Sequence, residues 1–224
     1  MILLTSFKII ELKLKRLLKI IVIFLSLIGF AAVIRRCLLL NHIIAPTNLS
    51  KYPNFDSGFS IHPALTFAHI IPGALFMITG PLLFLTNNQK HEKLNKGIEF
   101  IYFLVSYIIG VTALLMSYTT SIGGANETAA TTLFAVFFLF CLSKALFYWK
   151  SKIDNLKKEW LLRSLSIGLA ISTTRIIVGA FFALSHLSPH EFFGIAFWIG
   201  FTLHLIVVEA WIRNTKPQLS RDGN

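Results

Sequence analysis

The chain has 224 residues, of which 55% are hydrophobic and 14% are charged, and its formal net charge is +11. Soluble domains are usually about 45–50% apolar and about 25% charged, so this composition excludes an ordinary soluble domain and indicates a multi-span membrane protein. The basic residues lie in short segments between apolar runs, which predicts the lipid bilayer as a partner and no nucleic acid.

Six apolar runs are each long enough to cross a bilayer as a helix, which needs about 20 residues. Helices are expected because backbone polar groups inside lipid must be paired within their own segment. The predicted fold is an all-α membrane protein, a six-transmembrane-helix bundle over residues 17–212. The spans are placed at 17–40, 62–85, 98–121, 128–149, 160–184 and 190–212.

The two ends of the chain are predicted to be cytoplasmic. Fifteen Lys and Arg residues lie on one side of the predicted spans and three on the other, which fixes this orientation by the positive-inside rule. Residues 1–16 are a basic segment, for which a short amphipathic helix on the membrane surface and a plain basic tail both stay open. Residues 213–224 are a polar C-terminal tail.

The second span carries a histidine inside the stretch AHIIPGALFMITGP. His62, Thr66 and His69 follow the 3.6-residue repeat, so they share one helix face. Pro72 removes the hydrogen bond to the carbonyl of Ala68, which predicts a loosened backbone beside His69. Two interpretations stay open: a polar site, or a kinked packing helix in which His69 is hydrogen-bonded structurally.

The fifth span carries a similar stripe that contains Ser172 and Arg175. Counted from the outer helix ends, His69 and Arg175 differ in depth by only about 3 Å at a rise of 1.5 Å per residue. We therefore expect an outward-facing polar pocket for a small anionic ligand or for protons. Its predicted lining is His69, Arg175, His62, Thr66 and Ser172. The alternative is that Arg175 extends to the membrane surface or to loop carbonyls.

An inner polar layer is also predicted. Arg163 and Glu209 lie at similar depth near the cytoplasmic ends of the last two spans, which favours a structural ion pair. His91, in the basic loop KHEKLNK, is assigned to the same cytoplasmic side. Cys37 and Cys141 have no CxxC pattern, so neither a disulfide nor a metal site is predicted.

These residues resemble a known set, that of the predicted bacterial membrane proteins called domain of unknown function 2306. The similarity is carried by HIIPGALFMITGPLLF, KHEKLNKG, SIGGANETAATTLFAVFFL, EWLLRSLSIGLAISTTRIIVGAFFA and HEFFGIAFWIGFTLHLIVVEAWI. The family's histidines match His69 and His91, and its two arginines match Arg163 and Arg175. Lys157 departs from the pattern, because the family usually has a histidine there. The resemblance implies six spans and a multi-pass location in the bacterial inner (cytoplasmic) membrane; it implies no activity.

Three functions remain to be compared. The first is binding or transport of a ligand between His69 and Arg175. The second is a haem b cytochrome, for which two histidines would ligate iron; His69 and His204 differ in depth by about 10 Å, which disfavours that pair and leaves His186 as a partner. The third is a structural or assembly protein whose small-residue stripes serve helix packing. No nucleophile, phosphate-loop or zinc motif is present, so no catalytic residue, metal or required cofactor is predicted.

Overall fold

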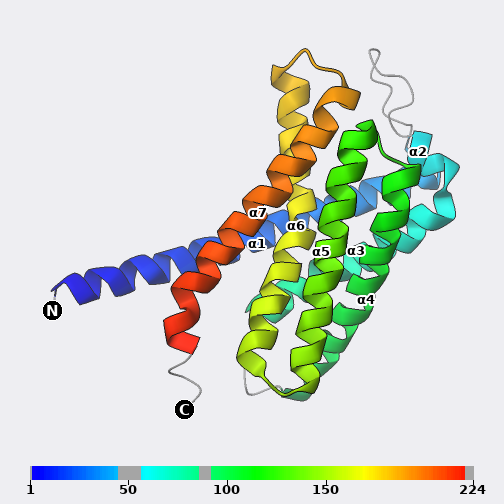
Figure 1. Ribbon diagram of the computed structural model, residues 1–224. Helices are drawn as coiled ribbons and strands as arrows, with labels where there is room; N and C mark the ends of the chain where they lie inside the picture. The colour runs from blue at the N-terminus through cyan, green and yellow to red at the C-terminus, as the bar shows by residue number, and fades with distance from the viewer. Residues whose placement is uncertain (1, 45–56, 86–91, 220–224) are drawn as a thin grey trace.

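The computed structural model describes residues 2–44, 57–85 and 92–219, and every regular element within these ranges is an α-helix. Figure 1 shows a bundle of long helices crossed by the first one. The elements are α1 (Ile2–Leu40), α2 (Ser57–Ile61), α3 (Pro63–Leu85), α4 (Glu92–Thr119), α5 (Gly124–Lys150), α6 (Asp154–Leu184) and α7 (Pro189–Leu219).

Six of these helices are long and apolar enough to span a membrane, which confirms the predicted fold class. The helices extend beyond several predicted span limits: α4 begins at Glu92 and α6 at Asp154. A helix need not end where the hydrocarbon ends, because polar turns continue into the interface. In the same way α1 runs without a break through residue 16, since no glycine or proline precedes Gly29. Figure 1 shows its first turns projecting away from the bundle.

Helix α1 crosses the bundle and packs against α3 and α6 (Figure 1). Gly29 lies at this crossing, where an added Cβ atom would stand 2.6 Å from the Met77 Cε atom and 2.9 Å from the Ser172 hydroxyl oxygen. Similarly, a Cβ atom on Gly80 would meet the side chain of Leu165. Small residues at these positions let the helix backbones approach closely, as in other membrane bundles.

The two prolines in α3 do not interrupt it. Both Pro72 and Pro81 lie inside one continuous helix, so the hydrogen bond that Pro72 removes beside His69 does not end the helix there. Neighbouring helices hold this segment in place: Phe76 stacks on Tyr102 of α4 with ring centroids 5.3 Å apart. Packing against α4 therefore keeps α3 helical across a position where a hydrogen bond is lost.

The inner half of the bundle has a closed core. Phe76 and Tyr102 are almost fully buried in it, and the Tyr102 hydroxyl is 2.8 Å from the Ser164 hydroxyl. In contrast, the face of α4 that points away from the bundle carries a stripe of exposed apolar residues. They are Phe100, Leu104, Ile108, Val111 and Leu115. Their spacing of three or four residues marks the face of the helix that contacts lipid.

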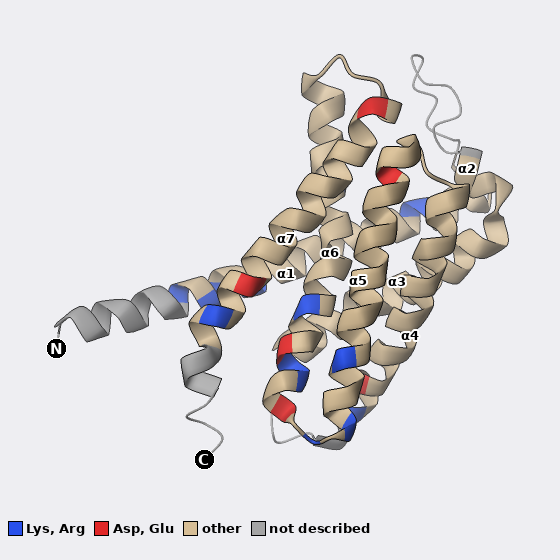
Figure 2. Cartoon of the chain, in the orientation of Figure 1, with Lys and Arg blue, Asp and Glu red and all other residues tan. Residues whose placement is uncertain are grey.

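Charge is distributed unequally along the bundle (Figure 2). We call the end that carries the α4–α5 turn and the α6–α7 loop the outer end, and the opposite end the inner end. Among the described side chains, Lys and Arg gather in the inner half: Lys13, Lys15, Arg16, Lys19, Lys96, Lys144, Lys150, Lys152, Lys157, Lys158, Arg163 and Arg213. The described exceptions are Arg35, Arg36 and Arg175. Under the positive-inside rule this asymmetry predicts that the inner end is cytoplasmic.

Candidate ligand cavity

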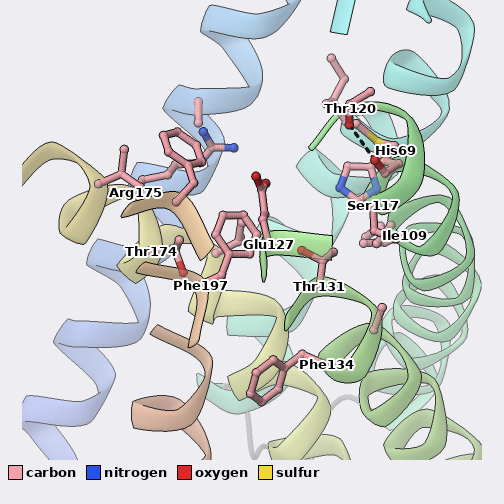
Figure 3. A pocket seen from close by; sticks show the side chains of 18 of the residues that line it. His69, Ile109, Ser117, Thr120, Glu127, Thr131, Phe134, Thr174, Arg175 and Phe197 are labelled. Atoms are coloured by element: carbon pink, nitrogen blue, oxygen red, sulfur yellow. Dashed lines mark hydrogen bonds between the residues drawn. The ribbon is translucent and has the colours of Figure 1, made fainter. Parts of the chain in front are cut away.

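A cavity of about 650 Å³ lies in the outer half of the bundle, and all seven described helices contribute residues to its lining. Its volume falls in the range of about 300–1,000 Å³ typical of ligand pockets. Figure 3 shows Arg175 and His69 on opposite sides of it, with Glu127 between them. His69 and Arg175, which were predicted from the sequence to lie at the same depth, thus line the same cavity.

Three arginines line this cavity: Arg35 and Arg36 of α1, and Arg175 of α6. They are the basic residues that the described outer half contains. Arg36 also lies over the ring of Phe59, 3.8 Å from its centroid. Arg175 is nine residues from the end of α6, about 14 Å along the helix. Each cation is therefore placed where lipid alone would leave it poorly solvated.

Arg175 forms no hydrogen bond, ion pair or ring contact within the described part of the chain. Its side chain is exposed because the cavity is open beside it. The charges that act on it are those of Arg36 and Arg35, which have the same sign and repel it. The guanidinium thus has donors directed into the cavity, and none of them is hydrogen-bonded to a described residue.

His69 is held by α4. Its Nδ1 atom is 2.9 Å from the Thr112 hydroxyl, which is itself 2.7 Å from the Ile108 carbonyl. If the single hydroxyl proton is donated to that carbonyl, the imidazole Nδ1–H donates to Thr112 and the other ring nitrogen is an acceptor. The charge of Arg175 acts on this ring across the cavity. His69 is thus both a packing residue and part of the cavity wall, which combines the two interpretations that the sequence left open.

Glu127 was not predicted as a site residue, yet it lines the cavity near its mouth. Its carboxylate accepts hydrogen bonds from the backbone N–H groups of Ile122, at 2.7 Å, and of Gly123. Gly124 follows with φ of +58°, a conformation that favours glycine. Glu127 therefore holds the α4–α5 turn and adds a negative charge to a mostly positive cavity mouth.

We expect Glu127→Ala to lower the free energy of unfolding by about 1 kcal/mol, because two backbone donors lose their acceptor beside a cavity that water can enter. Glu127→Gln keeps a side-chain oxygen at this place, so its free energy of unfolding is expected to fall by less than that of Glu127→Ala. The midpoint of thermal unfolding in a neutral detergent measures the difference. Equal midpoints for the two variants would contradict this role of the carboxylate.

The deep part of the cavity is apolar. Phe193, Phe197 and Phe201 recur every four residues on α7 and line the cavity from its outer level inward, and Phe201 reaches the deep part beside Phe134 and Phe138 of α5. Phe134 stacks on Phe201 with ring centroids 4.7 Å apart. The cavity thus changes from charged at its mouth to aromatic at its base.

Three of the predicted lining residues are not in the cavity wall that the described residues form, and a ligand-binding role for them stays a prediction. Thr66 is fully buried and its hydroxyl is 3.0 Å from the carbonyls of Phe59 and His62. The His62 side chain is exposed at the start of α3. Ser172 is fully buried against Gly29 of α1. About 60° of helix rotation separates Ser172 from Arg175, which is enough to turn it from the cavity to the neighbouring helix.

The inner layer contains the ion pair expected between Arg163 and Glu209. The Arg163 Nη2 atom is 3.1 Å from Glu209 Oε2, and its Nε atom contacts Oε1. Glu159 lies 3.7 Å from the same guanidinium, which also stacks over Trp160. A second pair, unpredicted, joins Lys157 of α6 to Glu99 of α4 at 2.9 Å. His91 lies outside the described residues.

His204 lies between α6 and α7 instead of in the cavity. Its Nε2 atom is 2.7 Å from the Thr173 hydroxyl, and Ser166 lies 3.4 Å from Nδ1. Of the described histidines, His69 is the one in the cavity lining, so His69 and His204 do not form a ligand pair there. No group of three or more His, Cys, Asp or Glu residues suited to a metal occurs among the described residues.

Besides Glu127, two charged cavity residues were not predicted as site residues: Arg35 and Arg36. They contributed only to the charge count on the outer side of the predicted spans. The signal that points to them is their position: two adjacent arginines within five residues of the end of α1, on the side that the positive-inside rule leaves poor in basic residues.

Comparison with known proteins identifies the family. A family model described as "Predicted membrane protein (DUF2306)" matches residues 66–212. No curated protein and no solved structure shows significant similarity. The matched region includes His69, Glu127 and Arg175, whereas α1 with its two cavity arginines precedes it. The match covers more than half of the chain, so the protein is an integral, multi-span membrane protein that belongs to the DUF2306 family.

Proposed function

We propose that this protein binds a small anionic ligand in the cavity at the outer end of its bundle. The observation that supports this most strongly is Arg175, a cation within a membrane span that makes no hydrogen bond or ion pair with any described residue and is exposed to the cavity. Ionisable residues in such positions are costly and are usually paired, so an unpaired one favours an external partner. An anion would supply that partner.

The neighbours of Arg175 favour the same charge. Arg35 and Arg36 add two further guanidinium groups to the lining, against one carboxylate from Glu127. Guanidinium groups present paired N–H donors that match carboxylate or phosphate oxygens. His69 adds a ring nitrogen on the opposite wall, which can contact a polar atom of the ligand.

The proposal is binding instead of passage through the bundle. Beneath the cavity, Phe76 and Tyr102 are buried together, and the ion pair of Arg163 with Glu209 lies closer to the inner end. This packing supports a cavity that is closed on the inner side. With the inner end cytoplasmic, as the charge asymmetry predicts, the ligand enters from the outer side of the membrane.

Cysteine labelling tests both the charge preference and the side of access. Thr131 lines the cavity, and Thr131→Cys would be made in a background of Cys37→Ser and Cys141→Ala. We expect a membrane-impermeant anionic thiosulfonate, added outside intact cells, to react about tenfold faster than its cationic analogue, because the arginines concentrate anions in the cavity. Leu187→Cys, in the exposed α6–α7 loop, is the matched control and should show little preference.

Adding Arg175→Gln to the Thr131→Cys variant should remove most of this preference. Faster reaction with the cationic reagent, or an anion preference that survives the loss of Arg175, would overturn the proposal. If the reagents label Thr131→Cys only from the inner side, the proposed orientation is wrong. The charge preference can then still be measured in inverted vesicles, whose inner side faces the reagent.

A further inference from the structure

The cavity has a polar end and an apolar end, arranged along the membrane normal. Arg36 is four residues from the outer end of α1, and Arg175 is nine residues from the outer end of α6. By the same count Phe138 is fourteen residues into α5, about 21 Å from the start of that helix. Charged groups thus lie in the outer part, and the aromatic base lies near the middle of a hydrocarbon layer about 30 Å thick.

The polar part of the wall is confined to the outer levels. Besides the arginines, it includes Ser117, Thr120 and Ser121 near the end of α4, and Glu127 near the start of α5. Gly179, one turn beyond Arg175, has no atom within 4 Å of the place where a Cβ would stand, so open space lies beside the guanidinium. The headgroup of a ligand has both donors and room at this level.

The deep part of the wall offers the opposite chemistry. Phe134, Phe138, Ile167 and Phe201 are buried apolar residues that meet there from three helices. A hydrated inorganic anion would leave this part of a 650 Å³ cavity unfilled or fill it with poorly bound water, because the site offers water few partners. An apolar chain would fill it and contact the aromatic rings.

We propose that the ligand is a single-chain anionic amphiphile, with a carboxylate or phosphate headgroup between Arg35, Arg36 and Arg175 and its hydrocarbon chain in the aromatic base. This inference rests on the proposed anion binding and specifies the class of anion. The chain moves between two apolar surroundings, lipid and cavity, so its transfer contributes only a modest, several-fold preference for a chain that fills the aromatic base. Selectivity for charge therefore arises at the headgroup, and selectivity for chain length at the base.

Binding of defined probes to the purified protein in nanodiscs of zwitterionic phosphatidylcholine tests the inference. The probes are palmitate, hexadecyl phosphate, hexadecanol, hexadecyltrimethylammonium, octanoate, acetate and inorganic phosphate. A ligand that binds the folded state raises the midpoint of thermal unfolding. We expect palmitate, hexadecyl phosphate or both to raise it, whereas the neutral and cationic C16 probes do not; the two anionic probes distinguish a carboxylate from a phosphate headgroup. Octanoate should bind several-fold more weakly than palmitate at equal mole fraction in the bilayer.

The possible failures separate the two proposals. Acetate or inorganic phosphate binding as well as the C16 anions would overturn the amphiphile and leave anion binding intact. No binding by any probe, with the anion preference in cysteine labelling retained, would do the same. Hexadecanol binding as well as palmitate would overturn both proposals, because the headgroup would then contribute nothing.

A variant pair tests the position of the chain. Ala135 lines the cavity, and Ala135→Leu adds apolar bulk there without changing any charge, whereas Val136→Leu adds bulk on the exposed face next to it. We expect Ala135→Leu to shift the preferred anion toward shorter chains and Val136→Leu to leave the preference unchanged. A merely structural disturbance would weaken all chain lengths equally. An unaltered preference in Ala135→Leu would place the chain elsewhere and overturn the inference.

Discussion

Arg163→Met is expected to lower the free energy of unfolding by about 3 kcal/mol, the largest loss that we expect from a single substitution in this chain. Removing one partner of a buried ion pair leaves the other charge uncompensated, at a cost of about 3–5 kcal/mol. The side chain of Arg163 is 12% exposed and that of Glu209 is 38% exposed, so water relieves part of the cost at Glu209. Glu159 also loses the guanidinium beside it, which keeps the expected loss within that range.

The measurement is the unfolding of the purified protein in neutral detergent, compared with Arg213→Met. Arg213 is exposed near the end of α7, so this control removes the same charge without removing a buried partner. The double variant Arg163→Met and Glu209→Met should recover part of the loss, since apolar side chains can replace a buried pair at little cost. If Arg163→Met is no less stable than Arg213→Met, the pair does not hold α6 to α7.

The membrane architecture follows from the sequence because lipid permits few alternatives. An apolar run of sufficient length must become a helix, so hydropathy alone placed all six spans. Depth could also be predicted, since every residue advances a helix by the same rise. That is why Arg163 was expected beside Glu209, and why His69 and Arg175 were expected at one level, where the structure has them in one cavity.

Rotation about the helix axis was harder to predict than depth. A stripe of small and polar residues is the same signal whether it faces a cavity or a neighbouring helix. Ser172 and Thr66 each lie three residues before a cavity residue, and both turn into helix contacts instead. For Ser172 the crossing of α1 decides which face is covered, and this depends on the tertiary position of Gly29, which no local pattern reveals.

Polar partners on other helices were the second feature that could not be predicted from the sequence. Thr112 holds His69 from a helix that carries no other sign of a site. Lys157 was noted as a departure from the family pattern, and its partner Glu99 lies 58 residues earlier in the chain. Such pairs require knowledge of which helices are neighbours, which the periodicity of a single helix does not contain.

The same substitution at Arg175 is expected to have the opposite effect on stability. Arg175→Met should raise the free energy of unfolding by about 1 kcal/mol, because an unpaired cation within a membrane span is costly even beside a cavity that admits water. Replacing Arg175 also relieves its repulsion by Arg35 and Arg36. At the same time the anion preference of the cavity should fall by about tenfold, since one of its three cations is lost.

Arg163→Met and Arg175→Met form a matched pair on one helix, twelve residues apart, and unfolding of both in the same detergent tests the argument. Stability gained at the expense of binding is the usual sign of a residue kept for function instead of for folding. If Arg175→Met is destabilised as strongly as Arg163→Met, the guanidinium stabilises the fold itself, and the proposal loses its main support. If Arg175→Met is stabilised and retains the anion preference, binding depends on Arg35 and Arg36, and α1, which precedes the matched family region, supplies the site.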